Sequence, residues 1–266
     1  MSDLLQRVRD LLPESYPWSD LFQYFPEVGS TNDVLKVLAK QGAPQGTALM
    51  AGAQTAGRGR LGRSFQSPPL SGVYLSMLLR PRCAPAQLMH LTCATAVAMC
   101  QAVEETVGIR PGIKWTNDLV WQRRKLGGIL TELGLSPEGW VEYAIVGIGI
   151  NCATPDFGPE LRGITTSLEQ ITGQQIPREA LAAAMLTNLA RMSQELTAQR
   201  QAILHQYRRD CITIGQDVSL VQGDWVRHGR AMDIDDQGAL VVRLPDGSIE
   251  AVNAGEVSVR GMYGYV

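Results

Sequence analysis

Hydrophobic residues recur along the chain with two different periods, which predict a mixture of strands and helices. Short apolar or alternating runs, the pattern of strands, occur near residues 21–28, 47–54, 73–79, 112–121, 125–135 and 139–150. Apolar positions spaced as on one face of a helix occur near 2–12, 30–42 and 86–107, and through most of 166–207. Helix 86–107 is apolar on more than one side, so we expect it at the centre. The pattern predicts an α+β fold, a mixed β-sheet with helices packed on it.

The pattern changes after residue 214. Short alternating runs follow at near-regular spacing, at 218–220, 239–242 and 249–252, with turn sequences such as Asp246-Gly247 between them. Such runs are typical of a small β-barrel. A chain of 266 residues has room for a medium-sized domain and a small one. We therefore predict two domains, residues 1–214 and residues 215–266.

Composition excludes several classes of protein. The chain has 24 Lys and Arg against 26 Asp and Glu, a net charge of -2, which disfavours a broad face that binds nucleic acid. Its five Cys are scattered without a C-x-x-C pair and its three His are dispersed, which disfavours a disulfide framework or a zinc site. The N-terminus lacks the apolar core of a signal peptide, and we see no window of about 18 uncharged apolar residues. These features predict a cytoplasmic protein without a membrane span.

The most informative segment is rich in arginine and glycine, and runs from Gln54 to Arg63. Its glycines satisfy G-x-G-x-x-G, but Pro68-Pro69 follows soon afterwards and no helix opens there, which argues against a dinucleotide site. Arg58, Arg60 and Arg63 alternate with small residues, so the backbone can fold over an anion that the guanidinium groups hold. The residues also fit a solvated basic turn or a contact with nucleic acid. We expect this loop to be mobile until a ligand orders it.

A second cationic cluster lies between residues 110 and 125, where five Lys and Arg face one acid, Asp118. It predicts a second surface for an anion, although a hairpin tip with solvated charges fits the same pattern. Gly127-Gly128 interrupts an apolar strand, which indicates close approach of a ligand or of another backbone. Ser30-Thr31-Asn32-Asp33 has the composition of a helix start with a hydroxyl cap.

Five segments, in this order and at these separations, resemble the biotin protein ligase family. They are Ser30-Thr31-Asn32, the Gln54 to Arg63 loop with its G-R-G-R-x-G-R element, Lys114-Trp115-Thr116-Asn117-Asp118, Lys125 to Leu130, and Gly147 to Asn151. The resemblance runs from about Phe22 to the C-terminus. It implies a catalytic domain like that of class II synthetases, followed by an SH3-like barrel. It also implies that ATP activates biotin as biotinyl-5'-AMP, which then biotinylates a lysine of a biotin carboxyl carrier protein of acetyl-CoA carboxylase.

The resemblance also implies a role for each matching residue. The expected catalytic residues are Lys125, Arg60 and Arg58. The expected biotin-binding residues are Ser30, Thr31, Gln54, Gly57, Arg58, Lys125, Gly128 and Gly147. The expected ATP and adenylate ligands are Arg60, Arg63, Phe65, Asn117, Asp118 and Asn151, with Mg²⁺ near Asn117 and Asp118. Two positions depart from the family pattern, since Phe65 replaces a tryptophan that stacks on adenine and Thr116 replaces a proline.

Three other functions fit parts of the pattern. A lipoate protein ligase resembles this family in fold but lacks the arginine loop. A biotin-responsive repressor carries an additional N-terminal DNA-binding domain, and only some 20 residues precede the first expected strand, so we expect no DNA binding. A module that binds RNA through the arginine loop is the third. Some members of the family dimerise through a sheet edge, so a homodimer is among the expected partners.

Overall fold

The computed structural model describes residues 2–153, 163–222, 225–253, 256–259 and 262. A seven-stranded sheet forms its larger part, and its strands lie side by side in the order β1-β2-β3-β7-β6-β5-β4. Their bounds are β1 Phe22–Phe25, β2 Ala48–Ala51, β3 Gly72–Leu79, β4 Gly112–Lys114, β5 Asp118–Trp121, β6 Arg124–Leu135 and β7 Val141–Asn151. Only β1 and β2 pair in parallel, so the sheet is mixed, as predicted.

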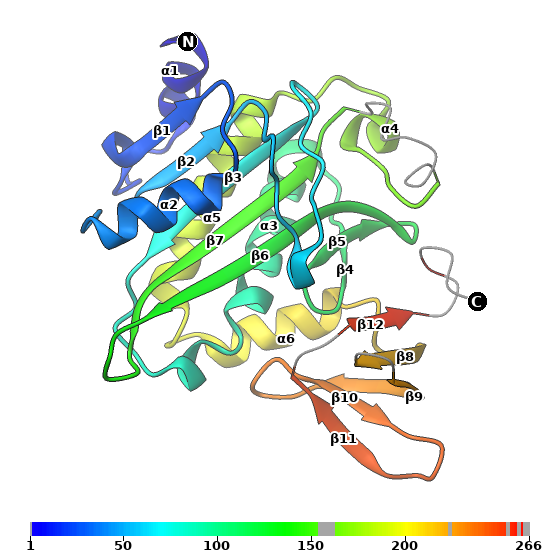
Figure 1. Cartoon of the computed structure of the whole chain (residues 1–266). Coiled ribbons are helices and arrows are strands. Elements are labelled where there is room, and N and C mark those ends of the chain that lie inside the picture. Colours follow the sequence, from blue (N-terminus) through cyan, green and yellow to red (C-terminus); the bar gives the residue numbers. More distant parts are fainter. Residues whose placement is uncertain (1, 154–162, 223–224, 254–255, 260–261, 263–266) are drawn as a thin grey trace.

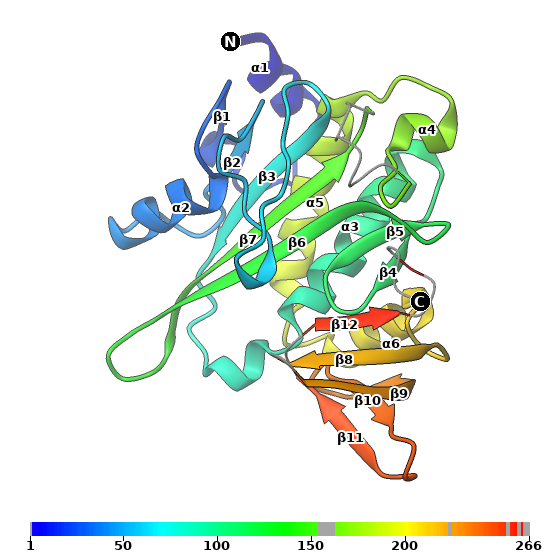
Figure 2. The same cartoon turned by 45° about the vertical axis from the view of Figure 1, so that its right-hand side comes forward.

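Helices cover both faces of this sheet (Figures 1 and 2). They are α1 Ser2–Leu11, α2 Thr31–Lys40, α3 Leu91–Val107, α4 Leu168–Thr172, α5 Arg178–Glu195 and α6 Arg200–Asp210. Three short 3-10 turns lie at Ser19–Leu21, Arg60–Gly62 and Pro85–Leu88. Helices α3 and α5 pack on one face, and α2 packs on the other.

The two-residue period of the strands separates the two faces. Leu75 and Met77 of β3 belong to the main core beneath α3 and α5, whereas Leu78 packs with Leu35 of α2. Because both faces are covered, the strand reads as a nearly continuous apolar run, with all its residues buried. Polar side chains on the α2 face of such a strand therefore stand out, and Ser76 is one of them.

The central helix corrects one statement made from the sequence. The segment Pro85–Val107 is long and apolar enough to pass a test for a membrane span by length and composition, which the sequence reading overlooked. In the fold, 72% of its most apolar window is buried inside the protein. Its apolar surface is explained by packing against the sheet and against α5.

Residues 112–121 also differ from the prediction, because they form two short strands rather than one. β4 and β5 pair antiparallel across a tight turn that contains Trp115 and Asn117. The backbone N–H of Trp115 donates to Oγ1 of Thr213 at 2.9 Å, so it leaves the sheet's hydrogen-bond ladder at this point. The turn places Asn117 and Asp118 beside β6.

A second, five-stranded antiparallel sheet follows α6, with the order β11-β10-β9-β8-β12. Its strands are β8 Asp217–Gln222, β9 Trp225–Ile234, β10 Leu240–Arg243, β11 Ile249–Val252 and β12 Glu256–Val259. β11 and β12 end the order among the described residues, so closure into a barrel stays a prediction, as does the domain boundary at 214/215. The sheet packs on α6, where Nε of Arg208 donates to the carbonyl of Ile234 at 2.7 Å.

Candidate active site

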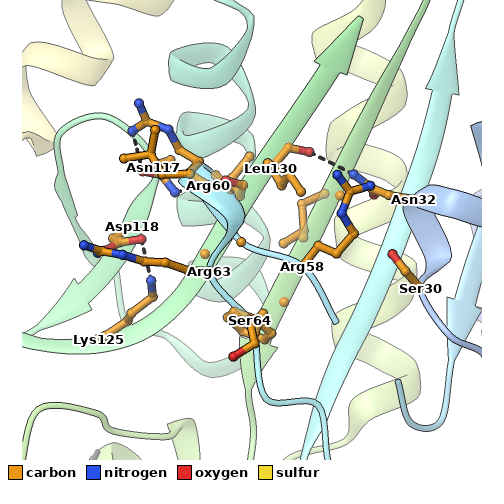
Figure 3. Close-up of a pocket in the computed structure, with 18 of the residues that line it drawn as sticks. Ser30, Asn32, Arg58, Arg60, Arg63, Ser64, Asn117, Asp118, Lys125 and Leu130 are labelled. Atoms are coloured by element: carbon orange, nitrogen blue, oxygen red, sulfur yellow. Dashed lines mark hydrogen bonds and ion pairs between the residues drawn. The ribbon is translucent and has the colours of Figure 1, made fainter. Parts of the chain in front are cut away.

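A pocket on the α2 face of the large sheet collects most of the residues predicted to act (Figure 3). The start of α2, the arginine loop, the β4–β5 turn, β6 and β7 all contribute to its wall. The predicted residues that line it are Ser30, Thr31, Gln54, Arg58, Arg60, Arg63, Phe65, Asn117, Asp118, Lys125, Gly128 and Gly147. Gly57 and Asn151 do not line it.

Glycines form the floor of the pocket because side chains along a strand alternate between the two faces of the sheet. In the sequence Gly147-Ile148-Gly149-Ile150 the isoleucines point into the main core, so both glycines face the pocket. Gly149 pairs with Gly128 of β6, which extends the floor across two strands. A Cβ on Gly147 would collide with the side chain of Asn32, and one on Gly149 with the ring of Phe65. Larger residues would therefore fill the pocket from below.

One end of the pocket is neutral, buried and internally hydrogen-bonded. Thr31 and Ser76 are each at most 4% exposed, and their hydroxyl oxygens lie 2.7 Å apart. Oε1 of Gln54 accepts from the N–H of Thr31 at 2.9 Å and from its hydroxyl at 3.1 Å. Ser30 precedes α2 as its N-cap, but its hydroxyl accepts no capping hydrogen bond and the residue lines the pocket instead. The predicted hydroxyl cap is therefore wrong.

The other end carries cations that are paired with the protein's own polar groups. Arg58 contacts Asp33 at 2.5 Å and Glu132 at 3.1 Å. Nζ of Lys125 lies 2.7 Å from Oδ1 of Asp118, with side-chain exposures of 31% and 13%.

Farther along the loop, Nη1 of Arg60 donates to Oδ1 of Asn117 at 3.0 Å. Arg63 extends toward Lys125 and Asp118 (Figure 3). The predicted anion-binding residues thus converge from three separate segments of the chain.

The arginine loop is folded back on itself. The N–H of Gly59 donates to the carbonyl of Arg63 at 2.7 Å, and the N–H of Phe65 to that of Gly57 at 2.9 Å. A Cβ on Gly57 would collide with the carbonyl of Phe65, so Gly57 permits this pairing rather than lining the pocket. The acids that pair with Arg58 supply the anion that the sequence reading expected only from a ligand. Mobility of the loop stays a prediction.

Two aromatic rings stand at the base of the loop. Phe65 lies on the glycine floor and meets Tyr74 edge to face, with ring centroids 6.5 Å apart. Burial raises the pKa of Tyr74 to about 12, so its phenol stays protonated at neutral pH. The phenol hydroxyl donates to the carbonyl of Pro68 at 3.0 Å, which fixes the segment that follows the loop.

Asn151 lies behind the pocket rather than in its wall. It is 5% exposed, and its Nδ2 donates to the carbonyl of Thr166 at 3.0 Å. Thr166 in turn donates its N–H to the carbonyl of Lys125 at 2.8 Å. Asn151 therefore supports the segment that flanks Lys125, and its predicted contact with the adenine side stays a prediction.

Several residues that build the neutral end were not predicted from the sequence. Asn32 and Gly149 line the pocket, and Ser76 and Glu132 lie next to it with polar contacts to Asn32. A signal existed for two of them. Gly149 alternates with core isoleucines, and Ser76 is the only serine or threonine within a buried run, Val73 to Leu79.

Comparison with known proteins agrees with the arrangement of the two sheets and the pocket. Residues 24–151 match the biotin/lipoate A/B protein ligase family, and residues 213–260 match the biotin protein ligase C-terminal domain. The bifunctional ligase/repressor BirA of Bacillus subtilis is 35% identical over 227 residues, covering 84% of this chain and 70% of that protein. The biotin–acetyl-CoA-carboxylase ligase of Mycobacterium tuberculosis is 33% identical over 240 residues, 87% of this chain and 86% of the relative.

A solved structure supports the same assignment. The biotin protein ligase of Aquifex aeolicus in complex with biotin and ATP superposes with a TM-score of 0.76 at 29% identity, covering 90% of this chain and 98% of that one. Identity above 30% across more than two thirds of both chains, together with this shared fold, shows that the chain belongs to the biotin protein ligase family.

Proposed function

We propose that the protein activates biotin with ATP as biotinyl-5'-AMP and then transfers biotin to a lysine of a biotin carboxyl carrier protein. The observation that supports the proposal is that one pocket has a neutral end and a cationic end. The neutral end suits a small polar ring that needs fixed hydrogen-bond partners, and the cationic end suits a carboxylate meeting a triphosphate. The Aquifex aeolicus relative, solved with biotin and ATP, supports both substrates.

In the first step a carboxylate oxygen of biotin forms a bond to the α-phosphorus of ATP, and the bond to pyrophosphate breaks. The carboxylate is ionised at neutral pH, so this step needs no general base, which agrees with a pocket whose wall contains no His among the described residues. The barrier arises from bringing anions together. Lys125, Arg58 and Arg60 would lower it by several kcal/mol if they hold the reacting groups in a site shielded from water.

The remaining predicted roles follow from position along the pocket. Ser30, Thr31 and Gln54 would hold the ureido ring at the neutral end, over the glycine floor. The residues assigned to the nucleotide and its phosphates are Arg60, Arg63, Phe65, Asn117 and Asp118. The folded loop would cover the adenylate and protect its mixed anhydride from hydrolysis.

Mg²⁺ would enter as part of the ATP complex. Among the described residues no group of three His, Cys, Asp or Glu side chains is arranged to hold a metal ion alone. Asp118 offers a carboxylate beside Lys125, which fits the way Mg²⁺ binds through one or two protein carboxylates together with substrate phosphates. Bound there, the ion would neutralise charge on the phosphates.

In the second step the ε-amine of the acceptor lysine attacks the carbonyl of the mixed anhydride, and AMP leaves. The amine must first lose a proton, because its pKa near 10.4 keeps it charged at neutral pH. We assign no base, and Asp118 and solvent are the candidates. The relative from Mycobacterium tuberculosis, named for acetyl-CoA carboxylase, supports the carrier protein of that enzyme as the acceptor.

Three further expectations stay predictions. The five described cysteines are buried and free, which is consistent with a reducing, cytoplasmic location. A homodimer through a sheet edge and the absence of DNA binding await direct measurement. The relative from Bacillus subtilis is named as a repressor as well as a ligase, and we do not propose the repressor role for this chain.

The test is incubation with labelled biotin, ATP, Mg²⁺ and a biotin carrier domain. Label should appear on the carrier lysine, and without carrier the protein should release pyrophosphate only when biotin is present. Lipoic acid serves as the matched control substrate, and its transfer in place of biotin would favour a lipoate ligase. Absence of ATP-dependent transfer of either acid would contradict the proposal and favour a binding module.

A further inference from the structure

A continuous hydrogen-bonded chain links the acid Glu132 on β6 to the neutral end of the pocket. Oε2 of Glu132 accepts from Nδ2 of Asn32 at 2.8 Å. Oδ1 of Asn32 accepts from the hydroxyl of Ser76 at 2.7 Å, and the oxygen of Ser76 lies 2.7 Å from that of Thr31. The hydroxyl oxygen of Thr31 lies 3.1 Å from Oε1 of Gln54. The chain joins groups on α2, β3, β6 and the start of the arginine loop.

The orientation of the Asn32 amide is determined by its partners. Its Nδ2 faces two acceptors, the Glu132 carboxylate and the carbonyl of Leu130 at 3.4 Å. Figure 3 shows the contact with Leu130. An amide turned the other way would place its oxygen against both acceptors. Oδ1 therefore faces Ser76, and Ser76 must use its only hydroxyl proton to donate to it.

This arrangement decides what Thr31 can offer to a ligand. Since the proton of Ser76 is committed to Asn32, the contact between the two hydroxyls requires Thr31 to be the donor. The other acceptor within reach of the Thr31 proton is Oε1 of Gln54. In either case the proton of Thr31 is directed to the protein, and its oxygen presents lone pairs to the pocket.

The carboxylate at the head of the chain forms ion pairs with two cations. Lys36 Nζ lies 2.6 Å and Arg58 Nη2 lies 3.1 Å from Oε1 of Glu132, while Oε2 is left for Asn32. The side chain of Glu132 is 19% exposed, so these pairs are only partly screened by water.

We infer that Glu132 is a positioning residue that sets the hydrogen-bond polarity of the biotin end, so that Thr31 accepts from an N–H of the ligand. This rests on the proposed function, because a ureido N–H is the donor that such an acceptor fits. Glu132 acts through Asn32 and Ser76 and does not line the pocket. The same carboxylate holds Arg58, so it connects the biotin end with the loop that closes over it.

The experiment measures biotin affinity by titration calorimetry without ATP, and adenylate formation at saturating biotin. Glu132→Gln keeps the shape but lets the side chain donate to Asn32 or accept from it, so the amide can turn over. We expect the Kd for biotin to rise about tenfold, as for loss of one well-placed hydrogen bond, with kcat changed much less. Glu142→Gln, an equal loss of charge at an exposed position on β7, is the control and should leave the Kd unchanged.

The second variant, Ser76→Ala, breaks the chain at its middle and should also raise the Kd about tenfold. If both act through one chain, the double variant should show about a tenfold rise rather than a hundredfold one. Additive effects, an unchanged Kd in Ser76→Ala, or an unchanged Kd in a folded Glu132→Gln would each overturn the inference. Failure of Glu132→Gln to fold would leave Ser76→Ala as the deciding variant. Wild-type protein that transfers no biotin would instead overturn the proposed function, and this inference with it.

Discussion

The two ends of the pocket are built on different physical principles. At the biotin end, Thr31 and Ser76 are buried and uncharged, and most of their hydrogen bonds already join protein to protein. At the phosphate end, Arg58 and Lys125 are 41% and 31% exposed and are paired with carboxylates of the protein. The groups of the first end are fixed by contacts within the protein, whereas the cations of the second would, under the proposed function, exchange their internal partners for substrate anions.

The difference separates binding from chemistry. A preformed neutral end loses little conformational entropy on binding, so it should determine the affinity for biotin. The cations stabilise the transition state, in which negative charge accumulates, more than they stabilise bound substrate, so they should determine kcat. Substitutions at the two ends should therefore change different kinetic constants.

The largest effect is expected at Lys125. Lys125→Ala removes a cation that we propose to lie next to the reacting groups, and biotin-dependent pyrophosphate release should fall by about 10²- to 10³-fold. The side chain is partly exposed, so the melting temperature should change little. Lys40→Ala, at an exposed position at the end of α2, is the control and should remain active. Near-normal pyrophosphate release from Lys125→Ala would remove this residue from the mechanism.

A smaller effect is expected at Thr31, and it should change the Kd for biotin rather than kcat. Thr31→Val keeps the volume but removes the hydroxyl, and the Kd for biotin should rise roughly 10- to 100-fold because buried partners lose a hydrogen bond. The rate at saturating biotin should stay within a few-fold of wild type. Thr187→Val serves as control, since that hydroxyl donates to the carbonyl of Ala183 on α5, on the opposite face of the sheet. A fall in kcat with unchanged affinity for biotin would contradict the prediction that the neutral end determines affinity and the cationic end determines rate.

Proteolysis of the arginine loop should respond more modestly. Trypsin should cut after Arg60 or Arg63 in the free protein, and biotin plus ATP at about ten times their Kd should slow cleavage roughly tenfold. The loop's own hydrogen bonds and the ion pairs of Arg58 already restrain it, which limits the difference. Cleavage at the exposed Arg243 provides an internal reference. Equal rates with and without ligands would show that the loop does not close on them.

The smallest effect is expected at Phe65. Phe65→Trp enlarges the ring that lies on the glycine floor, and stacking on adenine should tighten ATP binding about threefold. The affinity for biotin alone should not change. Calorimetry with a non-hydrolysable ATP analogue measures the first quantity, and weaker nucleotide binding would show that the ring supports the loop instead.

Much of the fold could be predicted because local patterns determine it. The strand and helix periods placed the main elements correctly. The β4–β5 hairpin was missed, since its strands are only 3 and 4 residues long and were predicted as one strand. The backbone N–H of Trp115 donates to the side chain of Thr213, 98 residues away in sequence, at the point where β4 ends.

The site divides in the same way. Residues carried by motifs, such as Arg58 and Lys125, reach the pocket as predicted. Gly57 and Asn151 belong to those motifs but serve the backbone around the pocket. The contact of Glu132 with Asn32 joins residues 100 positions apart, and pairing at that range depends on strand order rather than on any local signal.

The tie between Trp115 and the second sheet has a consequence for how the protein can be divided. Trp115 is only 4% exposed, and its indole Nε1–H donates to the carbonyl of Gly238 at 3.0 Å. Trp115 lies two positions before Asn117, which accepts a hydrogen bond from Arg60. A chain cut after residue 214 would leave that donor without its partner and uncover the indole ring. We therefore expect the small sheet and the large sheet to unfold together in a single cooperative transition.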